Sequence, residues 1–283
     1  MSSIQQAKRV VVKVGTSTLT HQTGLINIRR LEQLVKVLSD IKNAGKEIIL
    51  VSSGAIGVGV GKMALPQRPS DTPSKQAIAA IGQCELMYLY DKLFAEYNHI
   101  VAQVLLTRVI TDDSRTKCNV VNTLNRLLEM GAVPIVNEND TVAIEEIEFG
   151  DNDTLSALVA DLGGCDALVI LSDIDGLYDC DPRLHPNAKL IDTVEEIDDE
   201  IRLAAGGAGS ARGTGGMLTK IYAAQMATEA GIDMVILNGS NPERLYDLFD
   251  GKKVGTLFRT KQKRAACDGG EIKPAVAAAK NDR

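Results

Sequence analysis

The feature that most constrains the fold is a regular alternation of short β-branched apolar runs with longer segments of helical periodicity. The first run, residues 9–14, ends in a glycine turn, and a helical pattern over 28–41 separates it from a second run at 47–51. That order predicts a βαβ unit. Further strands are predicted at 100–106, 132–136, 167–171, 233–237 and 255–258, and helices at 74–97, 111–130, 152–162 and 216–230. The alternation predicts an α/β protein with a mainly parallel sheet covered on both faces.

Composition and charge exclude several other classes of protein. The chain has 283 residues, 45% hydrophobic and only 4% aromatic, which indicates a globular protein with an aliphatic core. A net charge of −6 gives no support to a nucleic-acid partner. No apolar run is long enough to span a membrane, and no apolar signal segment precedes the first strand. Five scattered cysteines without a C-x-x-C pair suit reduced thiols, so we expect a cytoplasmic protein.

Two acidic and amide-rich segments lie close together in the middle of the chain. Residues 137–140 (Asn-Glu-Asn-Asp) follow the predicted strand 132–136, and residues 150–153 (Gly-Asp-Asn-Asp) open the predicted helix 152–162. Ligands of open α/β sheets bind beyond the carboxyl ends of strands, so this concentration of polar groups predicts a polar ligand. The alternative is a helix cap, but a cap would use only one of these side chains.

Lys13 and the glycines that follow the first two strands are candidate anion-binding groups. Lys13 lies inside an otherwise apolar strand, where an unpaired ammonium would be costly, so it either reaches an anion beyond the strand or extends to solvent. Glycine turns let backbone N–H groups approach a phosphate. Two such turns are predicted, one at Gly15-Thr16 and one comprising Ser53-Gly54 with Gly57, Gly59 and Gly61. Neither fits a P-loop or a dinucleotide fingerprint, and either could be a simple tight turn.

The strongest phosphate signal is the glycine-rich run over residues 206–220. It contains six glycines within eleven residues and leads into a helix whose first turn carries Lys220. A helix N-terminus with an added lysine favours an anion, whereas a plain linker would not normally lead into such a helix. Ser172-Asp173-Ile174-Asp175-Gly176, after the fifth strand, lacks the features of a calcium loop and fits a loop near a nucleotide or Mg²⁺ better.

Together these groups indicate phosphoryl transfer. The moving phosphoryl group needs positive charge, which two lysines and two glycine-rich anion cradles supply. The group of carboxylates orients these cations. The sequence shows no Ser–His or Cys–His pair that would indicate a covalent mechanism. An acceptor that is already an anion, such as a carboxylate, would need no general base.

The motifs, taken in order, closely resemble the branch of the amino acid kinase family that phosphorylates L-glutamate. The resemblance covers about residues 8–258. It is carried by Val12–Ser17, Val51–Ile56, Asn137–Asp140, Phe149–Ala157, Ser172–Tyr178, Gly213–Met217 with Lys220, and Gly255–Phe258. It implies a three-layer α/β/α sandwich over residues 1–258, in which the N-terminal part binds glutamate and about 166–258 bind ATP. Residues 259–283 are expected to be a flexible tail.

The resemblance also implies the reaction and the residues that perform it. The expected reaction is ATP-dependent phosphorylation of the side-chain carboxylate of L-glutamate, the first step of proline biosynthesis. Lys13 and Lys220 would stabilise the transferring phosphoryl group, and Asp153 would orient both lysines. The expected glutamate ligands are Ser53, Gly54, Asp140 and Asn152. The expected ATP ligands are Lys13, Ser172, Asp173, Thr214, Gly215, Gly216, Met217, Leu218, Thr219 and Lys220.

The same resemblance implies Mg²⁺ bridging the ATP phosphates, with no protein ligand of the metal assigned. It further implies feedback inhibition by proline and a homodimer or homotetramer. About 25 residues follow residue 258, too few for the PUA domain that many family members carry, so no such domain is expected. Two alternatives remain open: a kinase for another small carboxylic acid such as N-acetylglutamate, and a non-catalytic sensor of an amino acid or nucleotide.

Overall fold

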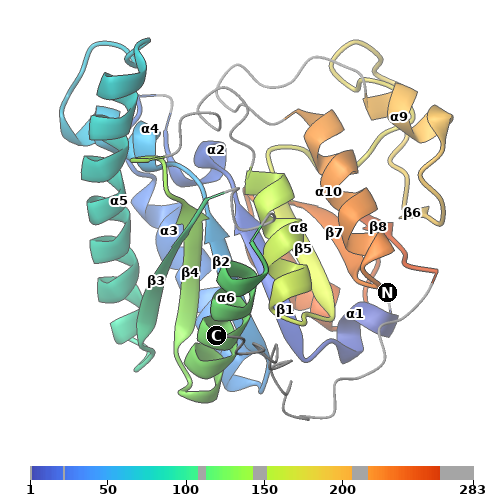
Figure 1. The fold of residues 1–283 in the computed structure, drawn as a ribbon. Coiled ribbons are helices and arrows are strands. Elements are labelled where there is room, and N and C mark those ends of the chain that lie inside the picture. The colour runs from blue at the N-terminus through green and yellow to red at the C-terminus, as the bar shows by residue number, and fades with distance from the viewer. Residues whose placement is uncertain (1, 22, 108–112, 143–151, 206–215, 262–283) are drawn as a thin grey trace, which may run out of the picture.

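The fold is organised around one mostly parallel sheet. The computed structural model describes residues 2–21, 23–107, 113–142, 152–205 and 216–261. In this part of the chain, eight strands run in the order β3-β4-β2-β1-β5-β7-β8-β6, and every pairing is parallel except β7 with β8 (Figure 1). The strands are β1 (Arg9–Val14), β2 (Glu47–Ser52), β3 (Val101–Leu106), β4 (Val133–Glu138), β5 (Ala167–Ser172), β6 (Thr193–Val194), β7 (Asp233–Asn238) and β8 (Thr256–Phe258).

Helices cover both faces, as the alternating pattern predicted. In Figure 1, α6, α8 and α10 lie on the face of the sheet toward the viewer, and α3 lies behind it. The helices are α1 (Ser2–Gln6), α2 (Thr16–Leu19), α3 (Ile28–Asn43), α4 (Ala55–Lys62), α5 (Thr72–Ala95), α6 (Ser114–Glu129), α8 (Asn152–Leu162), α9 (Asp199–Ala205), α10 (Met217–Glu229) and α11 (Arg244–Phe249). None of them, within the described ranges, is long and apolar enough to cross a membrane.

The central strand β1 shows how the sequence separates the two faces. Val10, Val12 and Val14 join the hydrophobic cluster formed with α3 and α5, whereas Val11 joins the cluster formed with α8 and α10. Side chains alternate along a strand, so Lys13 lies on the same face as Val11. Strand periodicity therefore directs the lysine toward α8 and α10.

Capping residues begin the long helices. The Asp71 carboxylate accepts from the backbone N–H of Ser74 at the start of α5, and Pro73 occupies the first turn. Asp113 does the same for α6, and Asn27 caps α3 by accepting from Arg30. A cap of this kind stabilises a helix by about 1 kcal/mol.

The interpretation of Gly57, Gly59 and Gly61 as part of an anion-binding turn was wrong. They lie in α4, and the one residue of this segment in the left-handed region is Gly54, with φ of 106°. A Cβ at Gly59 would lie 2.1 Å from the carbonyl oxygen of Ile78 on α5. The two helices therefore touch backbone to backbone, and these glycines serve packing.

Three further expectations concern segment boundaries. β4 extends to Glu138, so the first two residues of the acidic segment 137–140 belong to the strand. No strand was predicted between residues 171 and 233, yet this region contains β6, which pairs with β8. Residues 143–151, which include the first two residues of the acidic segment 150–153, lie outside the described residues, as does the glycine-rich run over 206–215.

Candidate active site

The site is centred on a buried cluster of two lysines and one aspartate. Asp153, in the first turn of α8, places Oδ1 2.5 Å from Nζ of Lys13 and Oδ2 3.0 Å from Nζ of Lys220. Lys13 comes from β1 and Lys220 from the first turn of α10, so three elements far apart in sequence meet at this carboxylate. The sequence predicted all three as site residues, and the structure brings them together.

The electrostatics of the cluster favour an additional anion. Asp153 is fully buried, and only 7% of each lysine is exposed. Burial by itself would raise the pKa of Asp153, but the ammonium groups of Lys13 and Lys220 outweigh it and hold the pKa well below its ordinary value. One carboxylate then faces two ammonium groups, so the cluster carries a surplus positive charge. A buried surplus charge is costly unless a counter-charge binds beside it.

The N-terminus of α10 lies against the same carboxylate. Thr219 donates its hydroxyl to Oδ2 of Asp153 at 3.0 Å and also contacts the carbonyl of Gly216 at 2.8 Å. Lys220 Nζ is 3.4 Å from that carbonyl. The first turn of α10 therefore lies against the cluster, and the positive end of the helix dipole adds to the attraction for anions.

A network of side-chain amides lies beside the cluster at the ends of β2 and β4. The amide Nδ2 of Asn152, the residue before Asp153, donates to Oγ of Ser53 at 2.7 Å and to Oδ1 of Asn137 at 2.9 Å. Nδ2 of Asn137 donates in turn to Oε1 of Gln83 at 2.8 Å. Ser53 and Asn152 were predicted as substrate ligands; Asn137 and Gln83 were not.

The remaining predicted site residues that the structure describes lie at the same carboxyl edge of the sheet. Gly54 caps α4 beside Thr16, and Asp140 lies half-buried in the turn after β4. Ser172 ends β5, with its hydroxyl 3.3 Å from the exposed Asp173. Gly216, Met217 and Leu218 form the start of α10, whereas Thr214 and Gly215 lie outside the described residues.

Sequence reasoning also missed the partners of Asp175. This carboxylate accepts from Nδ2 of Asn238 at 2.9 Å and forms an ion pair with Arg244 at 3.2 Å. These contacts connect the loop after β5 with the end of the adjacent strand β7 and with α11. The polar Asn238 at the end of an apolar strand was the available signal, as was Asn137 at the end of β4.

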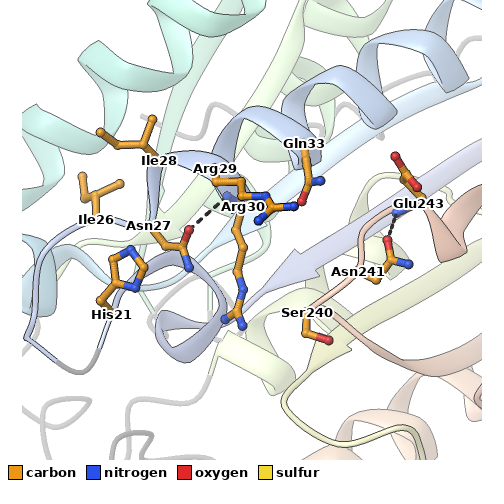
Figure 2. A pocket seen from close by; sticks show the side chains of 10 residues that line it. All are labelled: His21, Ile26, Asn27, Ile28, Arg29, Arg30, Gln33, Ser240, Asn241 and Glu243. Atoms are coloured by element: carbon orange, nitrogen blue, oxygen red, sulfur yellow. Dashed lines mark hydrogen bonds between the residues drawn. The ribbon is translucent and has the colours of Figure 1, made fainter.

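A separate cavity of about 690 Å³ lies at the N-terminus of α3 (Figure 2). Figure 2 shows the side chain of Arg30 reaching from α3 toward Ser240, with His21 on the other side. No predicted site residue lines this cavity. Its walls are His21, Ile26, Asn27, Ile28, Arg29, Arg30, Gln33, Ser240, Asn241 and Glu243.

The described residues contain no group of three or more His, Cys, Asp or Glu side chains that could hold a metal ion. The cluster holds two ammonium groups and one carboxylate, so it repels a free cation. A cation can approach it when phosphate oxygens already bind that cation, as they usually do for Mg²⁺.

Comparison with known proteins gives the family and the fold. The amino acid kinase family matches residues 8–238. Among solved structures, a T. acidophilum isopentenyl phosphate kinase product complex has a TM-score of 0.62 at 21% identity, covering 89% of this chain and 100% of the other. A UMP kinase from Bacillus anthracis has a TM-score of 0.62 at 17% identity, covering 90% and 97%. At these identities the structures support the fold alone.

The match spans most of the chain, so the protein belongs to the amino acid kinase family. Its curated relatives narrow the class. A glutamate 5-kinase of Clostridium perfringens (strain 13 / Type A) is 56% identical over 264 residues, covering 92% of this chain and 98% of the relative. A glutamate 5-kinase of Listeria innocua serovar 6a is 52% identical, covering 94% and 98%. Within the family, the chain groups with the glutamate 5-kinases.

Proposed function

We propose that this protein transfers the γ-phosphoryl group of ATP to the side-chain carboxylate of L-glutamate, producing L-glutamyl 5-phosphate. The observation that carries the proposal is the buried cluster in which Asp153 binds both Lys13 and Lys220. Such a cluster provides a fixed positive field where a phosphoryl group would move. The relatives at 52–56% identity support glutamate as the acceptor.

The chemistry needs stabilisation of charge more than proton transfer. The acceptor carboxylate is ionised at neutral pH, so its oxygen attacks phosphorus in line with the leaving ADP oxygen without a general base. Lys13 and Lys220 stabilise the charge that spreads over the transferring group and the leaving oxygen. Asp153 keeps the two ammonium groups in place before the substrates arrive, which avoids reorganisation during the reaction.

The two sides of the crevice divide the substrates. Ser53, Gly54, Asp140 and Asn152 hold glutamate, with Asp140 facing its α-ammonium. Ser172, Asp173 and the start of α10 from Thr214 to Lys220 hold the nucleotide. Mg²⁺ bound together with ATP would supply additional positive charge beside the phosphates, and no described residue is assigned to hold it.

The wider context of the reaction is also part of the proposal. Residues 1–258 act as one kinase domain, with the ATP-binding part over about 166–258. The enzyme works in the cytoplasm, as a homodimer or homotetramer, in the first step of proline synthesis, and proline inhibits it.

The experiment that tests the proposal measures ADP release from ATP in three reactions: with L-glutamate, with N-acetylglutamate and without an acceptor. We expect release with L-glutamate alone. ADP release with N-acetylglutamate but not with L-glutamate would show that N-acetylglutamate is the substrate. Saturable binding of ATP without ADP release in any of the reactions would indicate a sensor.

A further inference from the structure

We propose that Gln83 and Asn137 are positioning residues that fix which atoms of Ser53 and Asn152 face the substrate. The proposal rests on the glutamate-phosphorylating function above and deepens it, because it explains how the site selects an α-amino acid. Neither residue needs to touch the substrate. Both act through hydrogen bonds whose direction is set inside the protein.

The direction of the network is fixed by one backbone group. The backbone N–H of Glu138 can only donate, and it donates to Oδ1 of Asn137 at 2.8 Å. Since Oδ1 is thereby identified as the oxygen, the other atom of the Asn137 amide is the nitrogen, which must donate. Its acceptor is Oε1 of Gln83, at 2.8 Å. Asn137 is 2% exposed, so its nitrogen has little access to water as an alternative acceptor.

The same logic orients Asn152. Oδ1 of Asn137 accepts a second hydrogen bond, at 2.9 Å, so Asn152 must present Nδ2 to it. That nitrogen also donates to Oγ of Ser53 at 2.7 Å. Because Oγ of Ser53 accepts there, its own proton must point elsewhere.

Two groups are left for a ligand. Among the described residues, the hydroxyl proton of Ser53 has no acceptor, and Oδ1 of Asn152 is buried without a donor. A buried polar atom without a partner normally destabilises a fold, so a consistent reason for keeping it is a ligand that completes the bond. A donor beside an acceptor matches a ligand that carries both a carboxylate and an ammonium. The network thus presents the pattern of an α-amino acid.

Helix α5, which carries Gln83, is held firmly at this edge of the sheet. A Cβ at the neighbouring Gly82 would lie 1.8 Å from the carbonyl oxygen of Ala55, so α5 and α4 are in direct backbone contact. Two turns further on, the buried hydroxyl of Tyr90 lies 2.8 Å from Oγ of Ser52, the residue before Ser53. Gln83 therefore lies between two fixed contacts on the same helix.

The test replaces Gln83 by residues that differ in hydrogen-bond direction. Gln83→Glu keeps an acceptor for Asn137, whereas Gln83→Lys offers only donors. Charge alone would favour the Lys variant, because the substrate is an anion. Hydrogen-bond direction predicts the opposite order, so the pair separates the two explanations. Lys92→Met, at an exposed position on the same helix, is the control for altering α5.

We expect the KM for glutamate to be about tenfold higher in Gln83→Lys than in Gln83→Glu, with kcat and the KM for ATP changed less than threefold. The preference for glutamate over glutarate, which lacks the ammonium, should also fall about tenfold in the Lys variant. A merely structural defect would leave that preference unchanged. If the Lys variant does not fold, Gln83→Met takes its place, since Met also lacks an acceptor.

Equal glutamate KM values and equal preferences in the Glu and Lys (or Met) variants would overturn the network while leaving the proposed function intact. A wild-type protein that does not phosphorylate glutamate would instead overturn the proposed function. The network would then be judged by thermal unfolding, where the Lys or Met variant should unfold several degrees below the Glu variant. Equal melting temperatures in that case would contradict it.

Discussion

Asp153 is a charged side chain with no exposed surface, and the two ammonium groups that flank it stabilise its charge. Removing one partner of a buried ion pair typically costs about 3–5 kcal/mol, because it leaves a charge without compensation. The same arrangement is well suited to phosphoryl transfer. Its positive groups are already desolvated and held in place, so they respond fully to charge that develops on a substrate.

Lys220→Ala should lower kcat by about 10²–10⁴-fold, because it removes a charge that stabilises the transition state. Steady-state rates of glutamate-dependent ADP release measure this effect. Lys252→Ala is the control, since Lys252 is an exposed lysine paired with Asp247. Unchanged turnover in the Lys220 variant would show that this lysine acts outside the reaction.

The stability of the protein toward acid should depend on Asp153. Its pKa is lowered in the folded state, so its contribution to the free energy of unfolding is present above the unfolded pKa of about 3.9 and is lost as the pH falls toward the lower folded value. The difference in melting temperature between wild type and Asp153→Asn should therefore be large at pH 7 and shrink below about pH 4. Asp91→Asn, at an exposed position on α5, is the control. A difference that stays constant with pH would contradict the ion-pair account.

At the scale of elements, the contact between α4 and α5 determines where Ser53 and Gln83 lie. Gly59 and Gly82 allow the two backbones to meet, and α4 begins directly after the Ser53-Gly54 turn. The sequence analysis assigned Gly59 to a turn, which was wrong, and gave no role to Gly82. A glycine that serves a turn and one that serves helix packing look alike until the partner helix is known.

Gly82→Ala should destabilise the fold by about 3 kcal/mol, at the upper end of the cost of overpacking, although Ala is the better helix former. The added Cβ would lie 1.8 Å from the carbonyl oxygen of Ala55, and neither backbone can move alone. Chemical denaturation measures the loss, and Cys84→Ala, at an exposed position on α5, should change stability by less than about 0.5 kcal/mol. A neutral Gly82→Ala variant would show that the helices separate easily.

At the scale of the whole molecule, strand and helix periodicity was sufficient to predict the α/β class and the parallel sheet. The strands predicted at 167–171 and 233–237 each extend one residue further, to Ser172 and Asn238. β6 was not predicted, because a two-residue strand leaves no measurable periodicity. Periodicity in the sequence therefore predicts the longer strands and helices well and very short strands poorly.

The candidate site was predictable to a similar extent. Lys13, Asp153 and Lys220 stood out because charged residues interrupt apolar strands or open helices, and the structure places them in contact. Gln83 did not stand out in the sequence, because a glutamine on a half-buried helix face is common. Its partner Asn137 is also 54 residues away along the chain. Contacts between distant segments depend on strand order, which periodicity does not contain.

The central claim is that the Asp153 cluster transfers a phosphoryl group to a carboxylate. The most direct measurement is formation of γ-glutamyl hydroxamate from ATP, L-glutamate and hydroxylamine, in the wild type and in Lys13→Ala and Lys220→Ala. An acyl phosphate product reacts with hydroxylamine, so the wild type should form hydroxamate only when ATP is present. Each lysine variant should form it at least about 100-fold more slowly. Wild-type protein that releases ADP without forming hydroxamate, or lysine variants that form it at the wild-type rate, would contradict the account.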